Sequence, residues 1–581
     1  MPSQPSPPAA MILKSAQFLG YWGSGHLPEL ETQLDILSAA MDTFGVVKRR
    51  SSPIGGDLPQ AVWGVATTEA GGTDAWIKLE PKHLTLRRDA FGRSPLYWMQ
   101  IDQVIWFASR LQWLLPLSDR AVYVPAVYGY ACFSYVPTPL TPITGIFSLA
   151  ASTAQTWNQL PDGTLSQPIQ TCWQEWQESP EQLNDEAMAI AQLQTHLKNA
   201  VHQQIADLTD QPVGVFLSGG LDSSVVAALL VQAGLKVQAY TLNFGEPNLS
   251  EHWYAEQVAQ FLNIPLHIVN VTPKQVRSAL VPTAQALDLP FGDGVTVPLF
   301  LLAQAASQEV RVVFNGEGGD QLFAGWTNKP LIAAGVYQTE QPQTESFTQQ
   351  YLRTFHRLWG YEAQVFQSEI YAQVQTLDPQ QWLEMALASQ GCPSLLHRLR
   401  RATLMLKGAQ NIHPRAMNIG SAHRLDVRSP FCDLTLAQWA FQISSRLHLQ
   451  GACEKYILKR AVADWLPPEI VWRTKRGMGV PLTNWCFNDL WHDLGQWLNP
   501  ARLRREGLWH PNIAAQLVSG QLGTIQGRRI GECLWLLLMW QVWREVYQDC
   551  SRSVYSFDHP FWLPSWLGRS YLRLRKGVHQ W

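Results

Sequence analysis

The chain has 581 residues, which is too long for one hydrophobic core and predicts two or three domains. Hydrophobic residues make up 46% of it and charged residues only 15%, a composition that excludes a mostly disordered chain. The formal net charge is −2 and no basic run is long enough to bind a nucleic acid, so we expect no nucleic-acid partner.

The eight cysteines are scattered without a C-x-x-C pair, which argues against a zinc cluster and against the disulfide framework of a secreted protein. The first twenty residues lack a long apolar segment after a basic stretch, so they do not resemble a signal peptide. The most apolar run, Cys533–Trp543, is much shorter than the roughly 20 residues that a membrane helix needs. We therefore expect a cytoplasmic protein with no membrane partner.

Residues 11–165 contain short runs of alternating apolar and polar residues, such as AVWGVATTEAGGTDAWIKLE and QVIWFASR, separated by glycine and proline. This alternation is typical of antiparallel strands that bury one face, and it predicts an antiparallel β-sandwich domain. The polar stretch QEWQESPEQLNDEAM follows as the predicted linker, and it leads into a helix that ends near Asp207.

Strand-like and helix-like segments then alternate in a second domain, predicted over 185–550. PVGVFL, KVQAYTLNF, PLHIVNV and VRVVFN are typical of buried strands, and SSVVAALLVQAG and EHWYAEQVAQFLN of the helices between them. Continuous apolar strands that alternate with helices indicate a parallel sheet covered on both faces, so the predicted fold class is α/β and doubly wound. Beyond about residue 345 the pattern is mostly helical, and residues 551–581 form a predicted tail.

A glycine-rich string follows the first of these strands. It consists of Ser218, Gly219, Gly220, Leu221, Asp222, Ser223 and Ser224, and it opens the next helix. Glycines at a strand-to-helix turn let backbone N–H groups approach an anion closely, and the serines add hydroxyl donors. An aspartate would repel a bare phosphate, so Asp222 indicates Mg²⁺ between its carboxylate and a pyrophosphate. The alternative is a glycine turn in which Asp and Ser only cap the helix.

A second string, NGEGGDQLFAG, follows the strand-like VRVVF and contains Asn315, Gly316, Glu317 and Asp320. Open α/β sheets place their ligands at the carboxyl ends of their strands, so we expect the two strings to lie close together. Asp222 and Asp320 are then the predicted ligands of one Mg²⁺ ion, and Glu317 is the predicted base. The first string, SGGLDSS, lacks the Gly-Lys-Ser/Thr of a Walker A loop.

These strings resemble those of the asparagine synthetase family. SGGLDSS is similar to the PP-loop of enzymes that cleave ATP between the α- and β-phosphates, and VVFNGEGGDQLFAGW is similar to the family's VVLSGEGADELFGGY. RAMNIGSAHRLDVRSPFCD resembles its DRMSMAHGLEVRVPFLD, and EKYILKRAVADWLPPEIVWRTKRGMGVP resembles its K-x-x-L-R…LP…R-x-K segment. Towards the N-terminus, RRDAFGRSPLYW is similar to RDPFGxKPLYY.

The resemblance implies an ATP- and Mg²⁺-dependent enzyme that transfers AMP to a carboxylate. It implies catalytic roles for Arg473 and Lys475, the arginine and lysine of R-x-K, of which the lysine stabilises the adenylate and the leaving pyrophosphate in the family. It also implies a nucleotide-binding set composed of Leu217, Ser218, Gly219, Gly220, Leu221, Asp222, Ser223, Ser224, Leu242, Asn315 and Gly316.

The N-terminal region departs from the family at the position of its glutaminase nucleophile. Glutamine-dependent members begin Met-Cys-Gly-Ile, whereas the matching stretch here is AQFLG, with Ala16 at the cysteine position. The glutamine-holding strings HRGPD and NGEIYN are missing, and no cysteine precedes Cys132. We therefore predict that residues 11–165 form a degenerate glutamine amidotransferase type 2-like domain of Ntn-hydrolase fold, without a catalytic cysteine.

Three functions remain open. The first is an amide ligase similar to lasso-peptide macrolactam cyclases and β-lactam synthetases, which keep both domains and lose the cysteine; the tail PFWLPSWLGRSYLRLR favours the cyclases. The second is an asparagine synthetase that uses free ammonia, and the third is a non-catalytic binding scaffold. We expect a peptide or amino-acid carboxylate as substrate, and a precursor peptide with its leader-processing proteins as partners.

Overall fold

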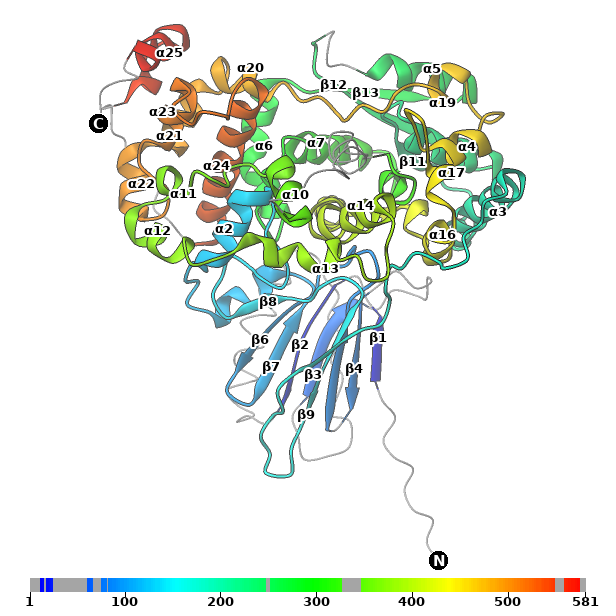
Figure 1. Cartoon of the computed structure of the whole chain (residues 1–581), viewed down its shortest axis with the longest axis horizontal. Coiled ribbons are helices and arrows are strands. Elements are labelled where there is room, and N and C mark those ends of the chain that lie inside the picture. The colour runs from blue at the N-terminus through cyan, green and yellow to red at the C-terminus, as the bar shows by residue number, and fades with distance from the viewer. Residues whose placement is uncertain are drawn as a thin grey trace, which may run out of the picture. The chain divides into compact units, whose positions relative to one another are not determined.

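The computed structural model describes residues 11–14, 17–23, 60–65, 75–80, 82–246, 251–325, 346–548 and 559–574 (Figure 1). The chain divides into two compact units. The first consists of Met1–Tyr123, Thr138–Trp176 and Lys407–Pro414, and the second of Val124–Pro137, Gln177–Leu406 and Arg415–Trp581. Each unit therefore contains a short segment from a part of the chain that otherwise belongs to the other.

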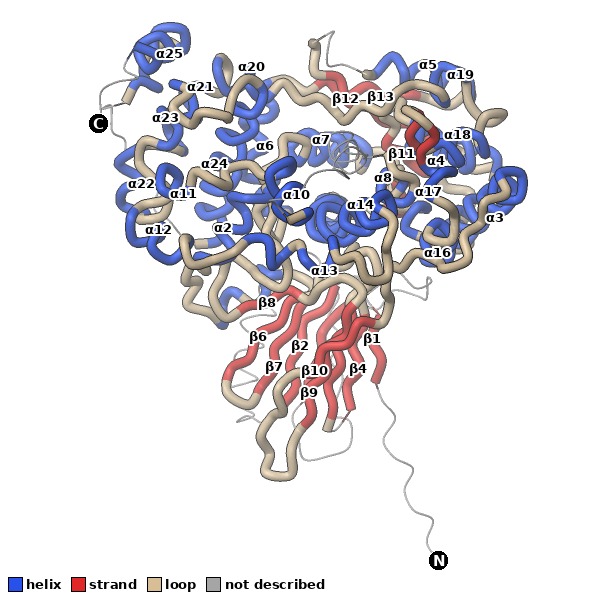
Figure 2. Tube along the Cα trace, viewed as in Figure 1, coloured by secondary structure: helices blue, strands red, loops and turns tan. Residues whose placement is uncertain are grey.

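The first unit is built on two five-stranded sheets, whose strands are red in Figure 2. All neighbouring strands in these sheets run antiparallel. In spatial order, one sheet contains β1 (Met11–Lys14), β4 (Trp76–Glu80), β5 (His83–Arg87), β9 (Thr153–Asn158) and β10 (Ile169–Cys172). The other contains β3 (Gln60–Val65), β2 (Gln17–Gly23), β7 (Val104–Ala108), β6 (Tyr97–Ile101) and β8 (Ile146–Ser148). The predicted antiparallel strands are confirmed.

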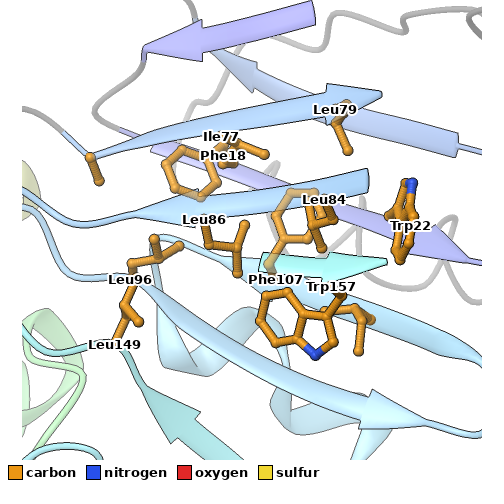
Figure 3. Close-up of a cluster of buried hydrophobic side chains, with 12 residues drawn as sticks. Phe18, Trp22, Ile77, Leu79, Leu84, Leu86, Leu96, Phe107, Leu149 and Trp157 are labelled. Atoms are coloured by element: carbon orange, nitrogen blue, oxygen red, sulfur yellow. The ribbon is translucent and has the colours of Figure 1, made fainter. Parts of the chain in front are cut away.

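The core of this unit lies between the two sheets (Figure 3). Trp22 and Phe107 come from one sheet, Ile77, Leu84 and Trp157 from the other, and each side chain is almost completely buried. In β4 and β9, buried residues alternate with partly exposed ones, as expected for a strand with one face on a core. Because burying one large apolar side chain contributes about 1.5–3 kcal/mol, this cluster is the main stabilising feature of the sandwich.

A buried polar turn closes one end of the sandwich core. The Asp89 carboxylate accepts the backbone N–H groups of Phe91, Arg93 and Ser94 at 2.9–3.0 Å. The Arg88 guanidinium donates to the Leu149 carbonyl at 2.7 Å and to the Gly92 carbonyl at 2.8 Å. The RRDAFGRS part of the family-like motif therefore has a structural role within this unit, because it satisfies polar groups that would otherwise be buried without partners.

The second unit contains one five-stranded parallel sheet (Figure 1). The spatial order is β13 (Leu266–Asn270), β12 (Val237–Asn243), β11 (Val213–Phe216), β14 (Val312–Phe314) and β15 (Asp426–Arg428). Successive strands are thus added first on one side of β11 and then on the other. This reversal creates a topological switch point between β11 and β14, where doubly wound sheets bind their ligands.

Helices connect and cover the parallel strands. Between β11 and β14 the chain forms α4 (Leu221–Gln232), α5 (His252–Leu262), α6 (Pro273–Ala286) and α7 (Thr296–Ala306). α4, α5 and α7 contact the strands directly. Because such crossovers are right-handed, the helices before and after the reversal cover opposite faces of the sheet. The mixed α/β architecture predicted from the alternating pattern is confirmed.

The remainder of the second unit is mostly helical, as predicted. Its longer helices are α2 (Val124–Phe133), α3 (Glu186–Ile205), α10 (Phe347–Phe355), α14 (Leu395–Thr403), α15 (His413–Ala422), α24 (Arg528–Tyr547) and α25 (Ser565–Leu574). Its shorter helices are α8 (Gly319–Leu322), α11 (Glu362–Val365), α12 (Ser368–Val374), α13 (Glu384–Leu387), α16 (Leu434–Ala440), α17 (Ser445–His448), α18 (Tyr456–Ala461), α19 (Pro468–Val471), α20 (Leu482–Phe487), α21 (Trp491–Trp497), α22 (Pro500–Glu506) and α23 (Ile513–Ser519). A two-stranded ribbon, β16 (Leu449–Gln450) and β17 (Cys453–Glu454), precedes α18.

The apolar run Cys533–Trp543 lies within α24 and is buried. The indole N–H groups of Trp535 and Trp543 donate to the carbonyls of Asp293 and Asp288 at 3.1 and 3.0 Å. α24 therefore packs as a core helix that also holds the segment between α6 and α7. None of the described helices combines the length and the low polarity that crossing a membrane requires.

Candidate active site

The first glycine-rich loop connects β11 to α4 at the carboxyl edge of the parallel sheet. Gly219 has φ +69°, and a Cβ atom there would lie 2.6 Å from the backbone nitrogen of Ala255, so the loop needs glycine at this position. The Ser223 hydroxyl lies 3.1 Å from the Ser218 hydroxyl and accepts the Ser218 backbone N–H at 3.2 Å. The predicted loop therefore has a defined conformation at the N-terminus of a twelve-residue helix.

The second loop follows β14 and is held by Asn315. The Asn315 backbone N–H donates to the Arg428 carbonyl at 3.0 Å. Its side-chain oxygen accepts from the Ser429 hydroxyl at 2.6 Å and from the Glu317 backbone N–H at 3.2 Å. Gly318, with φ +100°, then turns the chain into α8, which contains Asp320.

The two loops approach each other so closely that one position between them has no room for a side chain. A Cβ atom on Gly316 would lie 2.6 Å from the Ser223 backbone nitrogen and 2.8 Å from the Asp222 carbonyl carbon. Gly319 stands where the similar string VVLSGEGADELFGGY has alanine. A Cβ atom on Gly319 would lie 2.5 Å from the Asp222 carboxyl carbon. The contact therefore brings α8 directly against the side chain of Asp222.

Four charged side chains meet at this contact. Lys455 Nζ lies 2.5 Å from Asp222 Oδ2 and 2.5 Å from Asp320 Oδ1, and Lys475 Nζ lies 2.9 Å from Asp320 Oδ2. The Lys455 side chain is only 2% exposed, whereas that of Lys475 is 28% exposed. Two carboxylates and two ammonium groups thus form a charge-balanced cluster at the switch point, with Lys475 on its accessible side.

The cluster shifts the pKa values of its members. Burial acts to raise the pKa of Asp320, but the ammonium groups of Lys455 and Lys475 outweigh burial and hold that pKa well below its usual range. Burial acts to lower the pKa of Lys475, but Asp320 and Asp222 raise it, so this lysine is charged at neutral pH. Burial raises the pKa of Asp222 against the attraction of Lys455, and the neighbouring Asp320 adds to the rise.

Arg473 lies beside the cluster and holds the first loop. Its guanidinium donates to the Gly219 carbonyl at 3.0 Å and pairs with Glu251 at 2.5 Å. It also lies 3.8 Å from the centroid of the Tyr254 ring. We predicted a catalytic role for Arg473 alongside Lys475. In the structure, the Arg473 guanidinium contacts the backbone of the first loop and side chains at the start of α5.

Two residues that sequence reasoning did not select support Lys475. The Glu454 carboxylate accepts the Lys475 backbone N–H at 2.6 Å and lies 3.6 Å from the ammonium of Lys459. Lys459 in turn donates to the Arg473 carbonyl at 3.1 Å. Lys455, Glu454 and Lys459 all fall in EKYILKR, the part of the chain that resembles K-x-x-L-R, and that resemblance was the only available signal for them.

The other predicted nucleotide-binding residues lie along the same sheet edge. Leu217 donates its backbone N–H to the Tyr240 carbonyl at 2.9 Å, and Leu242 is buried in β12. Gly220 caps α4, which begins at Leu221, and Ser224 donates to the Gly220 carbonyl at 2.8 Å.

Two predicted features remain as predictions. Glu317, the predicted base, is half-buried. Its backbone carbonyl accepts from the Cys432 thiol at 3.7 Å, but this contact does not involve the Glu317 carboxylate. Ala16, the residue at the predicted nucleophile position, lies outside the described residues.

The residues present fit the predicted Mg²⁺ when nucleotide phosphates complete its ligand set. Within the described ranges, no group of three or more His, Cys, Asp or Glu side chains could hold a metal ion by itself. Asp222 Oδ1 is buried and has no hydrogen-bond partner among the described residues. Because Mg²⁺ commonly takes one or two carboxylates and fills its other positions with phosphates and water, Asp222 and Asp320 suit it.

Comparisons with known proteins agree with this arrangement. The asparagine synthase family matches residues 192–545, more than half of the chain, and a glutamine amidotransferase domain family matches residues 75–165. The glutamine-hydrolysing asparagine synthetase 1 of Bacillus subtilis (strain 168) is 22% identical over 79% of this chain and 74% of its own length. A putative glutamine-hydrolysing asparagine synthetase of Mycobacterium bovis is 25% identical over 81% of this chain and 75% of its own length.

Among solved structures, the NH3-dependent NAD synthetase of Campylobacter jejuni is 15% identical to this chain. The alignment covers 35% of this chain and 91% of that one, with a TM-score of 0.19.

The contact between the two loops predicts that Gly316→Ala weakens ATP binding. The added methyl would meet the backbone of Asp222 and Ser223, so the loops must separate. We expect the Kd for ATP, measured by calorimetry, to rise by at least about tenfold, which corresponds to about 1.4 kcal/mol. Gly477→Ala is the matched control, because a Cβ atom there has no neighbour within 4 Å. Unchanged ATP affinity in a folded Gly316→Ala variant would show that the loops do not form the nucleotide site.

Proposed function

This chain belongs to the asparagine synthase family, and on that premise we propose that it is an ATP-dependent ligase that adenylates a carboxylate and then forms an amide bond. The observation that carries the proposal is the meeting of Asp222, Asp320, Lys455 and Lys475 at the switch point, beside a glycine-rich loop that opens a helix. A scaffold without catalysis has no need of four charges here, because apolar side chains of similar volume often stabilise a fold at least as well as buried ion pairs.

The N-terminus of α4, which begins after Gly220, suits the pyrophosphate part of ATP, because the first N–H groups of a helix have no partner within the helix and attract anions. Asp222 and Asp320 would hold Mg²⁺, which when bound neutralises charge on the phosphates. Arg473 acts as a positioning residue in this proposal, since it binds the Gly219 carbonyl and so maintains the shape of the loop.

The reaction has two steps. In the first, a carboxylate oxygen of the substrate attacks the α-phosphorus, the bond from that phosphorus to the bridging oxygen breaks, and pyrophosphate leaves with the electron pair. Lys475 is charged and partly accessible, and Glu454 holds its backbone, so its ammonium is preorganised to meet the charge that develops on the leaving group. In the second step, an amine nitrogen attacks the acyl carbon, AMP leaves, and Glu317 takes the proton that the amine loses.

The sequence argues against glutamine as the nitrogen donor. Ala16 has neither a thiol nor a free amine, and the strings that hold glutamine in the family are missing. The amine must then come from another molecule or from the substrate itself. If it is the α-amino group of a peptide whose Asp or Glu is adenylated, the second step is effectively unimolecular, an advantage of up to about 7–11 kcal/mol. We therefore propose macrolactam formation in a lasso-type precursor peptide, with leader-processing proteins as partners.

The second candidate is an asparagine synthetase that uses free ammonia. Its support is that the two relatives given above are named asparagine synthetase and putative asparagine synthetase, and both names specify glutamine as the ammonia source. The two candidates share the adenylation step and differ only in the amine, so the same site serves both.

Lys475→Ala should lower the rate of AMP formation by about 10²–10³, because one preorganised stabiliser of the developing charge is removed. The rate is measured by chromatography of AMP under saturating ATP. Arg476→Ala removes an exposed cation from the adjacent position and serves as the matched control, for which we expect a rate within about twofold of the wild type. Equal losses in both variants would mean that general surface charge, and not the position of Lys475, accounts for the effect.

The choice between the two amines is decided by product mass. The enzyme is incubated with ATP, Mg²⁺ and either a core peptide that has a free amino end and an internal Asp or Glu, or aspartate with ammonia. The cyclase proposal predicts a peptide product lighter by one water, with one AMP formed per ring. Efficient asparagine formation, with no peptide that stimulates AMP release, would contradict the cyclase proposal and favour the ammonia-dependent synthetase.

A further inference from the structure

We propose that Lys455 occupies the position between Asp222 and Asp320 that the divalent cation takes during catalysis, so that the metal enters only together with nucleotide. This inference rests on the proposed function, because it concerns the same two carboxylates. It adds an order of binding: without ATP the protein carries its own cation at the metal position, and the phosphates of ATP release it.

The geometry of the bridge carries the inference. Lys455 Nζ is 2.5 Å from one oxygen of each aspartate, so it lies between the two carboxylates as a shared cation would. Lys475 contacts only Asp320, from the more exposed side, and does not bridge the pair. The two lysines therefore differ in position although each contributes one positive charge.

The surrounding backbone is shaped around this lysine. Lys455 has φ +56°, in the left-handed region that non-glycine residues seldom adopt, and it immediately precedes α18. A Cβ atom on Gly325 would overlap the Lys455 side chain at Cε, so the segment after α8 leaves room for the lysine and for nothing larger than glycine beside it. A backbone held in this conformation indicates that the position of the ammonium is built into the fold.

Charge balance explains why metal and lysine exclude each other. Two carboxylates are already matched by the ammonium groups of Lys455 and Lys475. A divalent cation added to this cluster would place two further positive charges beside Lys455 and Lys475, and among the described residues no group of three or more His, Cys, Asp or Glu side chains could hold it. Such an excess of charge is strongly unfavourable at low dielectric. ATP supplies the missing negative charge and also offers phosphate oxygens to the displaced ammonium, so metal and nucleotide bind together.

The test uses Mn²⁺ alone as the probe, with its binding to the full chain in the absence of nucleotide followed by electron paramagnetic resonance. The wild type should bind Mn²⁺ weakly. Lys455→Met keeps the length of the side chain and removes its charge, and it should raise the affinity for Mn²⁺ by at least about tenfold, since two facing carboxylates are left without their bridge. Adding Asp222→Asn to that variant should abolish the gain.

Lys475→Met is the matched control, because it removes the same charge and leaves the bridge in place. It should gain much less affinity for Mn²⁺ than Lys455→Met. An equal gain in both variants would overturn the inference, since net charge alone would then explain it. Tight binding of Mn²⁺ to the wild type in the absence of nucleotide would also overturn the inference. This measurement needs no variant, so the test does not depend on whether Lys455→Met folds.

Failure of this inference is distinguishable from failure of the proposed function. If the wild type forms AMP from ATP but binds Mn²⁺ tightly without nucleotide, the ligase proposal stands and the role of Lys455 is wrong. If no carboxylate substrate yields AMP while Lys455→Met alone gains Mn²⁺ binding, the bridge is real and the reaction is wrong.

Discussion

The close contact between the loops that follow β11 and β14 is the constraint on which the second unit's chemistry depends. At Gly316 the backbones of the two loops lie against each other. This contact places Asp222 and Asp320 where the ammonium of Lys455 reaches both carboxylates. Two buried carboxylates at this separation would repel each other strongly without a cation between them. The reversal of strand order at β11 creates the edge, the glycines permit the approach, and the lysine makes the approach electrostatically stable.

The contacts that stabilise the first unit do not involve position 16, the predicted position of the nucleophile. Its stability comes from apolar side chains between two sheets, among them Trp22, Phe107 and Trp157, and none of these depends on a residue that cleaves glutamine. The buried turn held by Arg88 and Asp89 likewise satisfies polar groups within the unit. RRDAFGRS therefore stabilises this unit whether or not the unit is active, since fold and activity are separable.

The sequence predicted local structure and motifs better than it predicted their long-range contacts. Alternating and continuous apolar runs indicated the antiparallel strands and the buried parallel strands, because one or two buried faces leave that pattern directly in the chain. The bridge by Lys455 was missed, since Lys455 lies 233 positions from Asp222 in the chain and a single lysine carries no periodicity. The exchange of 124–137 and 407–414 between the units left no local pattern either. Arg473 was chosen from its motif, but its contacts with Gly219 and Glu251 required the fold.

The central claim is that this site transfers AMP to a carboxylate oxygen, and isotope transfer tests it most directly. Core peptide or aspartate whose carboxylate carries oxygen-18 is incubated with ATP and enzyme, and the AMP is weighed. An acyl-adenylate intermediate requires that one labelled oxygen from the carboxylate leaves with AMP, so the account predicts AMP that is heavier by one such atom. Amide product accompanied by unlabelled AMP, or by ADP and phosphate, would contradict it.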